Sequence, residues 1–240
     1  MAKKVLVLMG GFSAEREVSL TTGKCVCAAL KKAGYEVVSH DLQNGFELVE
    51  TLKKEKPDVV FNALHGNWGE DGEIQGFLDV LQVPYTHSGL KASVLGMDKS
   101  LTKELASENG IKVPQGEKMT FRKFKAEGTF LKMPYVVKPV SDGSSVGVYI
   151  IRKKEDVEAV RYEDDREILI EEFIDGKELT CMILGSQAHV VTELRASDEF
   201  YDYHAKYTAG ATQHILPAEI PEEAANRCKL YAEHMHNILG

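Results

Sequence analysis

The first ninety residues alternate between continuous apolar runs and longer stretches in which apolar residues recur every three or four positions. A continuous apolar run is typical of a strand buried on both faces, and the second pattern is typical of a helix with one buried face. The pattern predicts strands at Val5–Met9, Tyr35–Asp41, Asp58–Leu64 and Val83–Thr86, and helices at Ser13–Ala33, Phe46–Glu55 and Glu73–Leu81. We expect Ser13 to cap the start of the first helix and Gly34 to end it. Strict alternation of strand and helix indicates a parallel sheet with right-handed crossovers.

Beyond Asp98 the pattern becomes that of an antiparallel α+β region. The predicted elements are helices at Asp98–Asn109, Glu155–Arg161 and Pro221–Leu239, and strands at Tyr135–Pro139, Val146–Ile151, Glu167–Ile174, Glu178–Leu184 and Ala188–Leu194. The first two strands flank a hairpin-like Gly/Ser loop, and Asp175-Gly176 predicts a tight turn between the third and fourth. We place a domain boundary near Ser88–Met97. The stretch Ala196–Gln213 lacks periodicity but is rich in aromatic residues, which favours an ordered functional loop.

Net charge, cysteine content and the length of the apolar segments limit the kinds of partner and the cellular location that we expect. The formal net charge of -8 over 240 residues argues against a nucleic-acid or anionic-membrane surface, although a pocket lined by a few lysines can still bind a nucleotide. The four cysteines form no CxxC pair, which is typical of reduced thiols in a cytosolic protein. No segment approaches the ~18 apolar residues of a membrane span. We therefore expect a cytoplasmic protein that contacts neither nucleic acid nor membrane.

The segment GGFSAEREVSL, Gly10–Leu20, is the first candidate site. Glycine-rich turns between a strand and a helix often hold phosphate, but the two acids in this turn repel it. Ligands of parallel sheets lie at the carboxyl ends of the strands, so we expect Glu15 and His65, each just past a strand, to face one crevice. The alternatives are that Glu15 only complements the helix dipole and that His65 is structural.

The segment VVKPVSDGSSVG, Val136–Gly147, is the second candidate site. Lys138 closes an apolar strand, where its charge is costly unless an anion meets it. The backbone N–H groups and hydroxyls of the Gly/Ser loop can fold over phosphate oxygens. Lys99 heads a helix, where the dipole disfavours a cation unless an anion lies nearby. An ordinary hairpin beside surface lysines is the alternative.

A third group of residues could hold a nucleoside. Glu171 ends an apolar strand and is followed by Phe173, Ile174 and, after a turn, Glu178. A carboxylate there can accept hydrogen bonds from an adenine amino group or ribose hydroxyls, with apolar walls around the base. For any single Glu, a solvated strand-end acid is the alternative.

Six motifs taken together resemble the D-alanine–D-alanine ligases of the ATP-grasp family. They are GGFSAEREVSL, ALHGNWGEDG, MDKSLTK, VVKPVSDGSSVGV, ILIEEFIDGKELT and FYDYHAKYTAG, in the order of that family. Each is weak alone, but six in order are highly specific. The resemblance implies an α/β fold in which an N-terminal parallel βαβ (pre-ATP-grasp) domain is followed by α+β ATP-grasp domains. The implied divisions are a substrate domain at 1–95, a central subdomain at 96–180 and an incomplete C-terminal subdomain at 181–240.

The resemblance also implies roles for single residues. ATP is expected between the central and C-terminal domains. The implied nucleotide contacts are Lys99 and Lys138 at the phosphates, Gly143, Ser144 and Ser145 in the flexible loop, Glu171, Phe173, Ile174 and Glu178 at the adenine and ribose, and Phe200, Tyr201 and Lys206 in a loop that closes over ATP. Glu15 is implied to hold the ammonium of the first D-alanine, with Val18 and His65 nearby. Ser144 and Tyr207 are implied to hydrogen-bond with Glu15 in the closed state, which makes these three the expected catalytic residues.

The activity implied is ATP-dependent joining of two D-alanines through an acyl phosphate, for peptidoglycan precursor synthesis, with Mg²⁺ or Mn²⁺ and as a homodimer. The family pattern continues with an Arg and with Asp, Glu and Asn metal ligands that the residues up to Gly240 do not supply. We therefore assign no metal ligand here and expect the 240 residues alone to be inactive. The rival hypotheses are another ATP-grasp ligase, such as one using D-lactate, and a non-catalytic nucleotide-binding protein. Lys206-Tyr207 favours an amine acceptor over D-lactate.

Overall fold

The computed structural model describes residues 2–196 and 212–240. It divides the chain into two compact units, Met1–Met97 together with Gly240, and Asp98–Leu239. The finer division into three domains stays a prediction. No described helix is long and apolar enough to cross a membrane.

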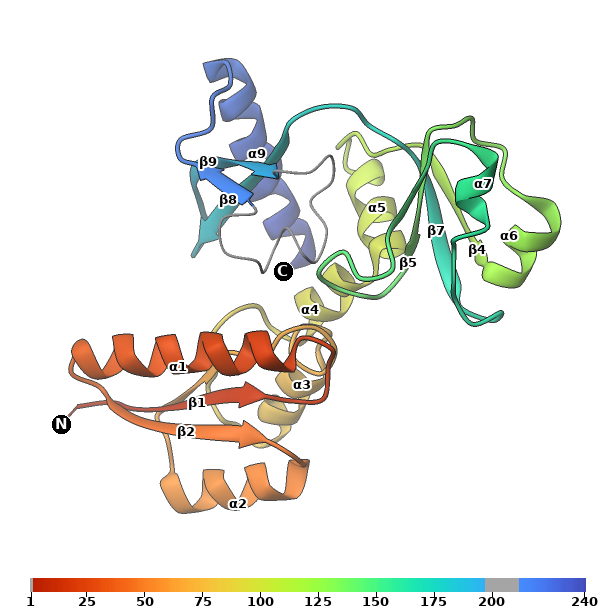
Figure 1. Cartoon of the computed structure of the whole chain (residues 1–240). Helices are drawn as coiled ribbons and strands as arrows, with labels where there is room; N and C mark the ends of the chain where they lie inside the picture. The colour runs from red at the N-terminus through yellow and green to blue at the C-terminus, as the bar shows by residue number, and fades with distance from the viewer. Residues whose placement is uncertain (1, 197–211) are drawn as a thin grey trace. The chain divides into compact units, whose positions relative to one another are not determined.

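The first unit contains a parallel sheet with the strand order β2-β1-β3. Its elements are β1 (Lys4–Gly10), α1 (Arg16–Lys32), β2 (Glu36–Leu42), α2 (Gly45–Glu55), β3 (Val59–Asn62), α3 (Glu73–Val80) and α4 (Leu90–Met97). Figure 1 shows α1 and α2 on opposite faces of this sheet. The predicted alternation of strands and helices is confirmed, and Val83–Thr86 contributes a single parallel bridge, Val60 with Tyr85.

The two-sided burial of β1 explains its uninterrupted apolar sequence. Val5, Val7 and Met9 belong to a core with residues of α1, whereas Leu6 and Leu8 pack with residues of α2 and α3. Helix α1 lies so close that a Cβ at Gly23 would stand 2.6 Å from the Cβ of Met9. Every side chain of this strand from Val5 to Met9 is therefore buried.

The first helix starts later than the sequence predicts. Ser13 was expected as its N-cap, but the helix begins at Arg16 with Glu15 as N-cap. The Ser13 hydroxyl accepts the Glu15 N–H at 3.1 Å and donates to the carbonyl of His65 at 2.6 Å. Ser13 therefore joins the loop after β1 to the loop after β3.

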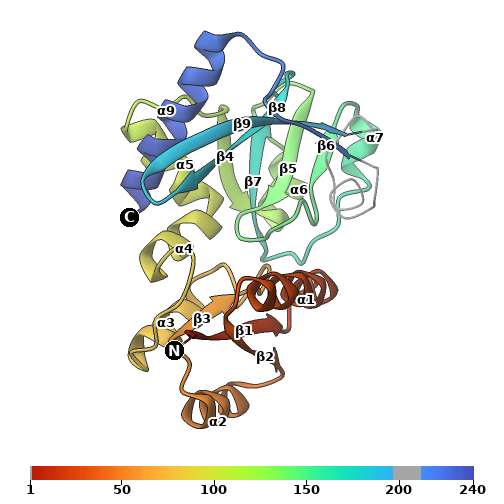
Figure 2. The same ribbon diagram turned by 90° about the vertical axis from the view of Figure 1, so that its left-hand side faces the viewer.

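The second unit contains two antiparallel sheets, of order β4-β7-β5-β6 and β10-β9-β8. Its elements are α5 (Lys99–Glu108), β4 (Gly116–Thr120), α6 (Phe121–Glu127), β5 (Tyr135–Pro139), β6 (Tyr149–Ile151), α7 (Lys154–Val157), β7 (Glu167–Glu172), β8 (Glu178–Leu184), β9 (Gln187–Ala196), β10 (Thr212–Ile215) and α9 (Glu222–Leu239). Figure 2 shows the strands of the four-stranded sheet side by side. Helix α9 packs on β8 and β9.

Two predictions for this unit are wrong. Asp175-Gly176 does not form the predicted tight turn between neighbouring strands, because β4 and β5 occupy both edges of β7 and β8 pairs with β9 in the other sheet. Strand β6 begins at Tyr149 rather than Val146, because the chain is still turning, with Ser144, Ser145 and Gly147 all at positive φ.

Some elements gave too little signal to be predicted. Strand β4, with the sequence GEKMT, lies at the edge of its sheet and has one buried position, so no apolar alternation marks it. Helices α4 and α6 are each only two turns long. Strand β10 overlaps the end of the predicted loop because it pairs with β9 across residues far apart in sequence.

Candidate functional site

The Gly/Ser loop between β5 and β6 is held at both ends. Arg166 donates to the Asp142 carboxylate at 2.5 Å, and Lys99 donates to the Asp142 carbonyl. The Tyr162 hydroxyl donates to the carbonyl of Gly147. Between these anchors, the left-handed φ angles of Ser144 (52°) and Ser145 (59°) are a conformation that non-glycine residues adopt at a cost. The surrounding structure therefore holds the loop in a specific shape.

This loop borders a cavity of about 480 Å³ within the second unit, a size that suits a drug-sized ligand. The cavity is lined by residues of the loop, of β5 and of the end of β7. They include eight of the residues predicted to contact ATP: Lys99, Lys138, Gly143, Ser144, Ser145, Glu171, Phe173 and Ile174. The fold thus brings residues from three separate motifs to one cavity. Their contact with ATP stays a prediction.

Side chains of both signs line this cavity, with Lys99 and Lys138 beside the acids Asp142, Glu171 and Glu172. Glu171 is 4% exposed and forms an ion pair with Lys138 through one oxygen. Its other oxygen lies 2.5 Å from the ammonium of Lys103. Burial, followed by the nearby charge of Lys138, holds the pKa of Lys99 below its usual value. Such close packing of cations favours an anionic ligand, whose charge would relieve the repulsion.

Lys103 was not among the predicted site residues. It lies four residues after Lys99 on α5, a spacing that puts both side chains on one face of the helix. That spacing was the signal available in the sequence. It could not show that Glu171 is the partner, because the pairing depends on how α5 packs against the sheet.

Apolar side chains also line the cavity. Val136, Val148, Phe173 and Ile174 contribute to its wall, and the guanidinium of Arg152 lies 5.5 Å from the centre of the Phe173 ring. A cation over an aromatic face is attractive, so Arg152 helps to fix this ring. A lining that combines lysines with apolar and aromatic side chains suits a molecule with a phosphate chain and a flat base.

Not every predicted nucleotide residue lies at the cavity. Glu178 is exposed at the start of β8 and does not line it. Phe200, Tyr201, Lys206 and Tyr207 lie outside the described residues, so their roles stay predictions.

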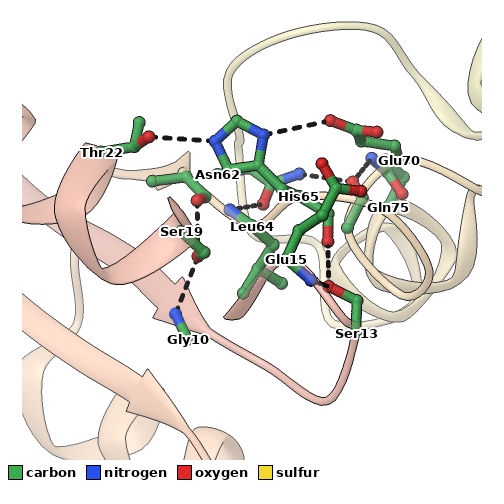
Figure 3. Close-up of polar contacts among 12 residues, drawn as sticks. Gly10, Ser13, Glu15, Ser19, Thr22, Asn62, Leu64, His65, Glu70 and Gln75 are labelled. Atoms are coloured by element: carbon green, nitrogen blue, oxygen red, sulfur yellow. Dashed lines mark hydrogen bonds and ion pairs between the residues drawn. The ribbon is translucent and has the colours of Figure 1, made fainter. Parts of the chain in front are cut away.

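A second polar cluster lies in the first unit, beyond the carboxyl ends of β1 and β3 (Figure 3). Glu15 is 4% exposed, and a Cβ at Gly66 would stand 2.6 Å from its carboxylate. The φ angle of Gly66 is also positive (66°), so this position in the loop after His65 favours glycine. Val18 lies on the following turn of α1 and is half-buried. The structure brings Glu15 and His65 to one region of the first unit.

His65 is held by two side chains. Its Nε2 lies 3.0 Å from the hydroxyl of Thr22, and its Nδ1 lies 3.5 Å from the carboxylate of Glu70 (Figure 3). The interaction with Glu70 is the main reason that the pKa of His65 lies above its usual value, with a smaller contribution from Glu15. Burial opposes this shift. The two acids therefore stabilise the protonated imidazole relative to that of a free histidine.

The loops around Glu15 and His65 are rigidly bonded. The Ser19 hydroxyl accepts the Gly10 N–H at 2.8 Å and donates to the Ala63 carbonyl at 2.7 Å. The side-chain amides of Asn62 and Gln75 both donate to the Gly69 carbonyl at 2.8 Å. These buried bonds fix the two loops before any ligand binds.

The metal predicted from the sequence has no ligand set in the described part of the chain. Residues 2–196 and 212–240 contain no group of three or more His, Cys, Asp or Glu side chains that could hold a metal ion. We therefore derive no chemical step through Mg²⁺ or Mn²⁺.

Comparisons with known proteins identify what the chain is similar to. The family models described as D-ala D-ala ligase C-terminus and D-ala D-ala ligase N-terminus match residues 105–240 and 42–88. A D-alanine–D-alanine ligase of Paramagnetospirillum magneticum is 47% identical over 243 residues, covering 100% of this chain and 79% of that protein.

Solved structures give the same result. The D-alanine–D-alanine ligase from Bacillus anthracis matches with a TM-score of 0.80 and 36% identity, covering 99% of this chain and 79% of that chain. A structure of the ligase from the same organism complexed with ATP matches with a TM-score of 0.79 and 32% identity, covering 99% of this chain and 78% of that chain.

Proposed function

The chain belongs to the D-alanine–D-alanine ligase family, and from this premise we propose that it joins two D-alanines at the expense of ATP. The observation that carries the proposal is the cavity of the second unit, where Lys99 and Lys138 face a fixed Gly/Ser loop and an apolar wall. A triphosphate and a purine fit these two chemistries. The product would serve peptidoglycan precursor synthesis in the cytoplasm.

The proposed reaction has two steps. A carboxylate is a poor acyl donor, so the γ-phosphoryl group of ATP is first transferred to the carboxylate of the first D-alanine, with ADP leaving. The amine of the second D-alanine then attacks the acyl phosphate, and inorganic phosphate leaves as the amide forms. Phosphoryl transfer depends mainly on positioning and on neutralising charge, which are the roles that we assign to Lys99, Lys138 and the loop amides.

The first D-alanine is proposed to bind in the first unit. Glu15 repels phosphate but attracts an ammonium group, and the preformed loops around it suit a small ligand. His65 is proposed to stand beside the same substrate. Ser144 and Tyr207 are proposed to hydrogen-bond with Glu15 when the enzyme closes, which would keep water from the acyl phosphate.

A coupled assay of the protein isolated from its natural source tests this function. Phosphate release should require ATP, Mg²⁺ and D-alanine, and mass spectrometry should detect D-alanyl-D-alanine. The substitution Glu15→Gln removes the charge proposed to attract the ammonium of D-alanine. It should raise the KM for D-alanine about tenfold or more while leaving ATP binding unchanged. Phosphate release that is faster with D-lactate than with D-alanine as acceptor would instead identify a depsipeptide-forming ligase.

The same assay tests the prediction that residues 1–240 alone have little activity. Robust turnover by that purified segment would contradict it, whereas ATP binding without turnover agrees with it. Homodimer formation is a separate proposal, and light scattering of the native protein measures it directly.

A further inference from the structure

We propose that Lys103 is a positioning residue for nucleotide binding, acting through Glu171 on Lys138. The inference rests on the proposed function in one respect, because it takes the cavity of the second unit to be the ATP site. Lys103 does not line the cavity, so it does not reach a ligand there directly. Any effect that it has on the ligand must pass through another residue.

The contacts of Lys103 identify that residue. Its ammonium lies 2.5 Å from one oxygen of Glu171 and donates to the Pro114 carbonyl at 2.8 Å. The other oxygen of Glu171 pairs with Lys138, which does line the cavity. The side chain of Glu171 is 5% exposed, so the two lysines supply most of the compensation for its charge. Lys103 thus fixes the carboxylate that in turn fixes Lys138.

The net charge of the three side chains supports the same role. Two lysines and one carboxylate carry a formal charge of +1, so Lys138 keeps positive charge available for an anion. Without Lys103, Glu171 and Lys138 form a neutral one-to-one pair. In a partly buried setting this difference acts strongly on a phosphate chain, because screening by water is reduced. By neutralising Glu171, Lys103 therefore leaves the charge of Lys138 available to an anion in the cavity.

Position on the fold supports the same assignment. Lys103 belongs to α5, Lys138 to β5 and Glu171 to β7, and β5 and β7 are neighbours in the four-stranded sheet. The carbonyl that Lys103 binds belongs to Pro114, itself a lining residue. One side chain outside the cavity thus holds two parts of its wall.

Titration calorimetry with ATP tests the inference. Lys103→Met keeps most of the alkyl stem but loses the charge, and we expect about tenfold weaker binding. Lys103→Gln keeps donors for Glu171 without the charge and should lose a similar amount. Lys103→Arg keeps the charge and should stay within about threefold of the original protein. The thermal midpoint of each variant is measured in parallel.

Lys118→Met is the matched control. Lys118 pairs with Glu167 at 3.3 Å, so it also joins a carboxylate of β7, but its side chain is 40% exposed and does not line the cavity. We expect ATP affinity within about twofold of the original protein, because an exposed pair is well screened.

A double-mutant cycle separates positioning from a general structural role. If Lys103 acts through Lys138, the Lys103→Met/Lys138→Met protein should bind ATP as weakly as Lys138→Met alone. If the double variant instead loses affinity by the product of the two single losses, the inference is overturned. Unchanged affinity in both Lys103→Met and Lys103→Gln would overturn it as well. Failure of the original protein to bind ATP would instead contradict the proposed function. Normal binding with no effect of Lys103 would contradict this inference alone.

Discussion

Glu171 and Glu193 are two buried glutamates of the second unit, 4% and 3% exposed, and each meets two cations. Glu171 pairs with Lys103 and Lys138, and Glu193 pairs with Lys177 at 2.9 Å and Arg195 at 2.7 Å. Their local chemistry is thus nearly the same. Their surroundings differ in charge and in access to a cavity.

The cluster around Glu193 is electrically neutral. Glu219 adds a second carboxylate 3.3 Å from Arg195, and both cations are about half exposed. Lys177 also donates to the Glu219 carbonyl at 2.7 Å, while the Glu219 N–H donates to Glu193 at 3.3 Å. These bonds tie the chain before α9 to β9. None of these residues lines the cavity of the second unit.

The comparison shows that a buried ion pair does not by itself mark a functional site. What distinguishes Glu171 is that it lines a cavity and that its two lysine partners outnumber it in charge, with Lys99 adding a further cation whose pKa burial lowers. The Glu193 cluster has no net charge. Its hydrogen bonds instead hold the segment before α9 against β9. Two experiments can break or sharpen this distinction, and a third tests a buried acid–base cluster in the first unit.

The largest expected effect is the loss of nucleotide binding in Lys138→Met. Removing the lysine that both lines the cavity and pairs with Glu171 should weaken ATP binding about a hundredfold. Lys177→Met removes the corresponding partner of Glu193 and should change ATP affinity less than about twofold. Equilibrium titration of ATP measures both. Equal losses in the two variants would erase the distinction between the clusters.

An intermediate effect is expected on stability at Glu193. Hydrogen bonds from Arg195 and then Lys177 hold the pKa of Glu193 below its usual value. A depressed folded-state pKa stabilises the protein above the unfolded pKa of about 4.3, and that stability is lost as the pH falls through the folded value. Glu193→Gln should therefore lower the melting temperature by a few degrees at pH 7, with the deficit shrinking in acid.

Thermal unfolding from pH 7 down to about pH 3 measures this difference. Glu127→Gln is the control, because its carboxylate is 66% exposed and lies 3.8 Å from Lys123. It should leave the melting temperature nearly unchanged. A deficit for Glu193→Gln that stays constant across the pH range would show that its carboxylate charge is not responsible.

The smallest effect concerns the acid–base cluster of the first unit. Glu70 is the main cause of the raised pKa of His65, so Glu70→Gln should let that pKa fall back toward about 6.5. An NMR titration of the imidazole signals measures the change. His40, whose pKa burial holds below its usual value, is the internal control. An unaltered His65 titration would assign the shift to Glu15 instead.

The sequence predicted most of the first unit because its signals are local. The run Val5–Met9 must be buried on both faces, and the alternation of strands and helices that follows allows few arrangements other than a parallel sheet. The sequence predicted fewer of the elements and connections of the second unit correctly. Strand β4 is a polar edge strand, and the turn at Asp175-Gly176 joins two sheets because both edges of β7 are already paired.

For the site, the sequence by itself determined the residue types that can meet a phosphate chain and a base. Lys138, the Gly/Ser loop and Phe173 could be selected because their chemistry is unusual at those positions. Only the tertiary structure decided that Lys103 and Lys138 share Glu171, and that Glu178 does not line the cavity. The physical reason is that local pattern reports which side chains are buried. Which buried charges meet is decided by strand pairing and helix packing between distant segments.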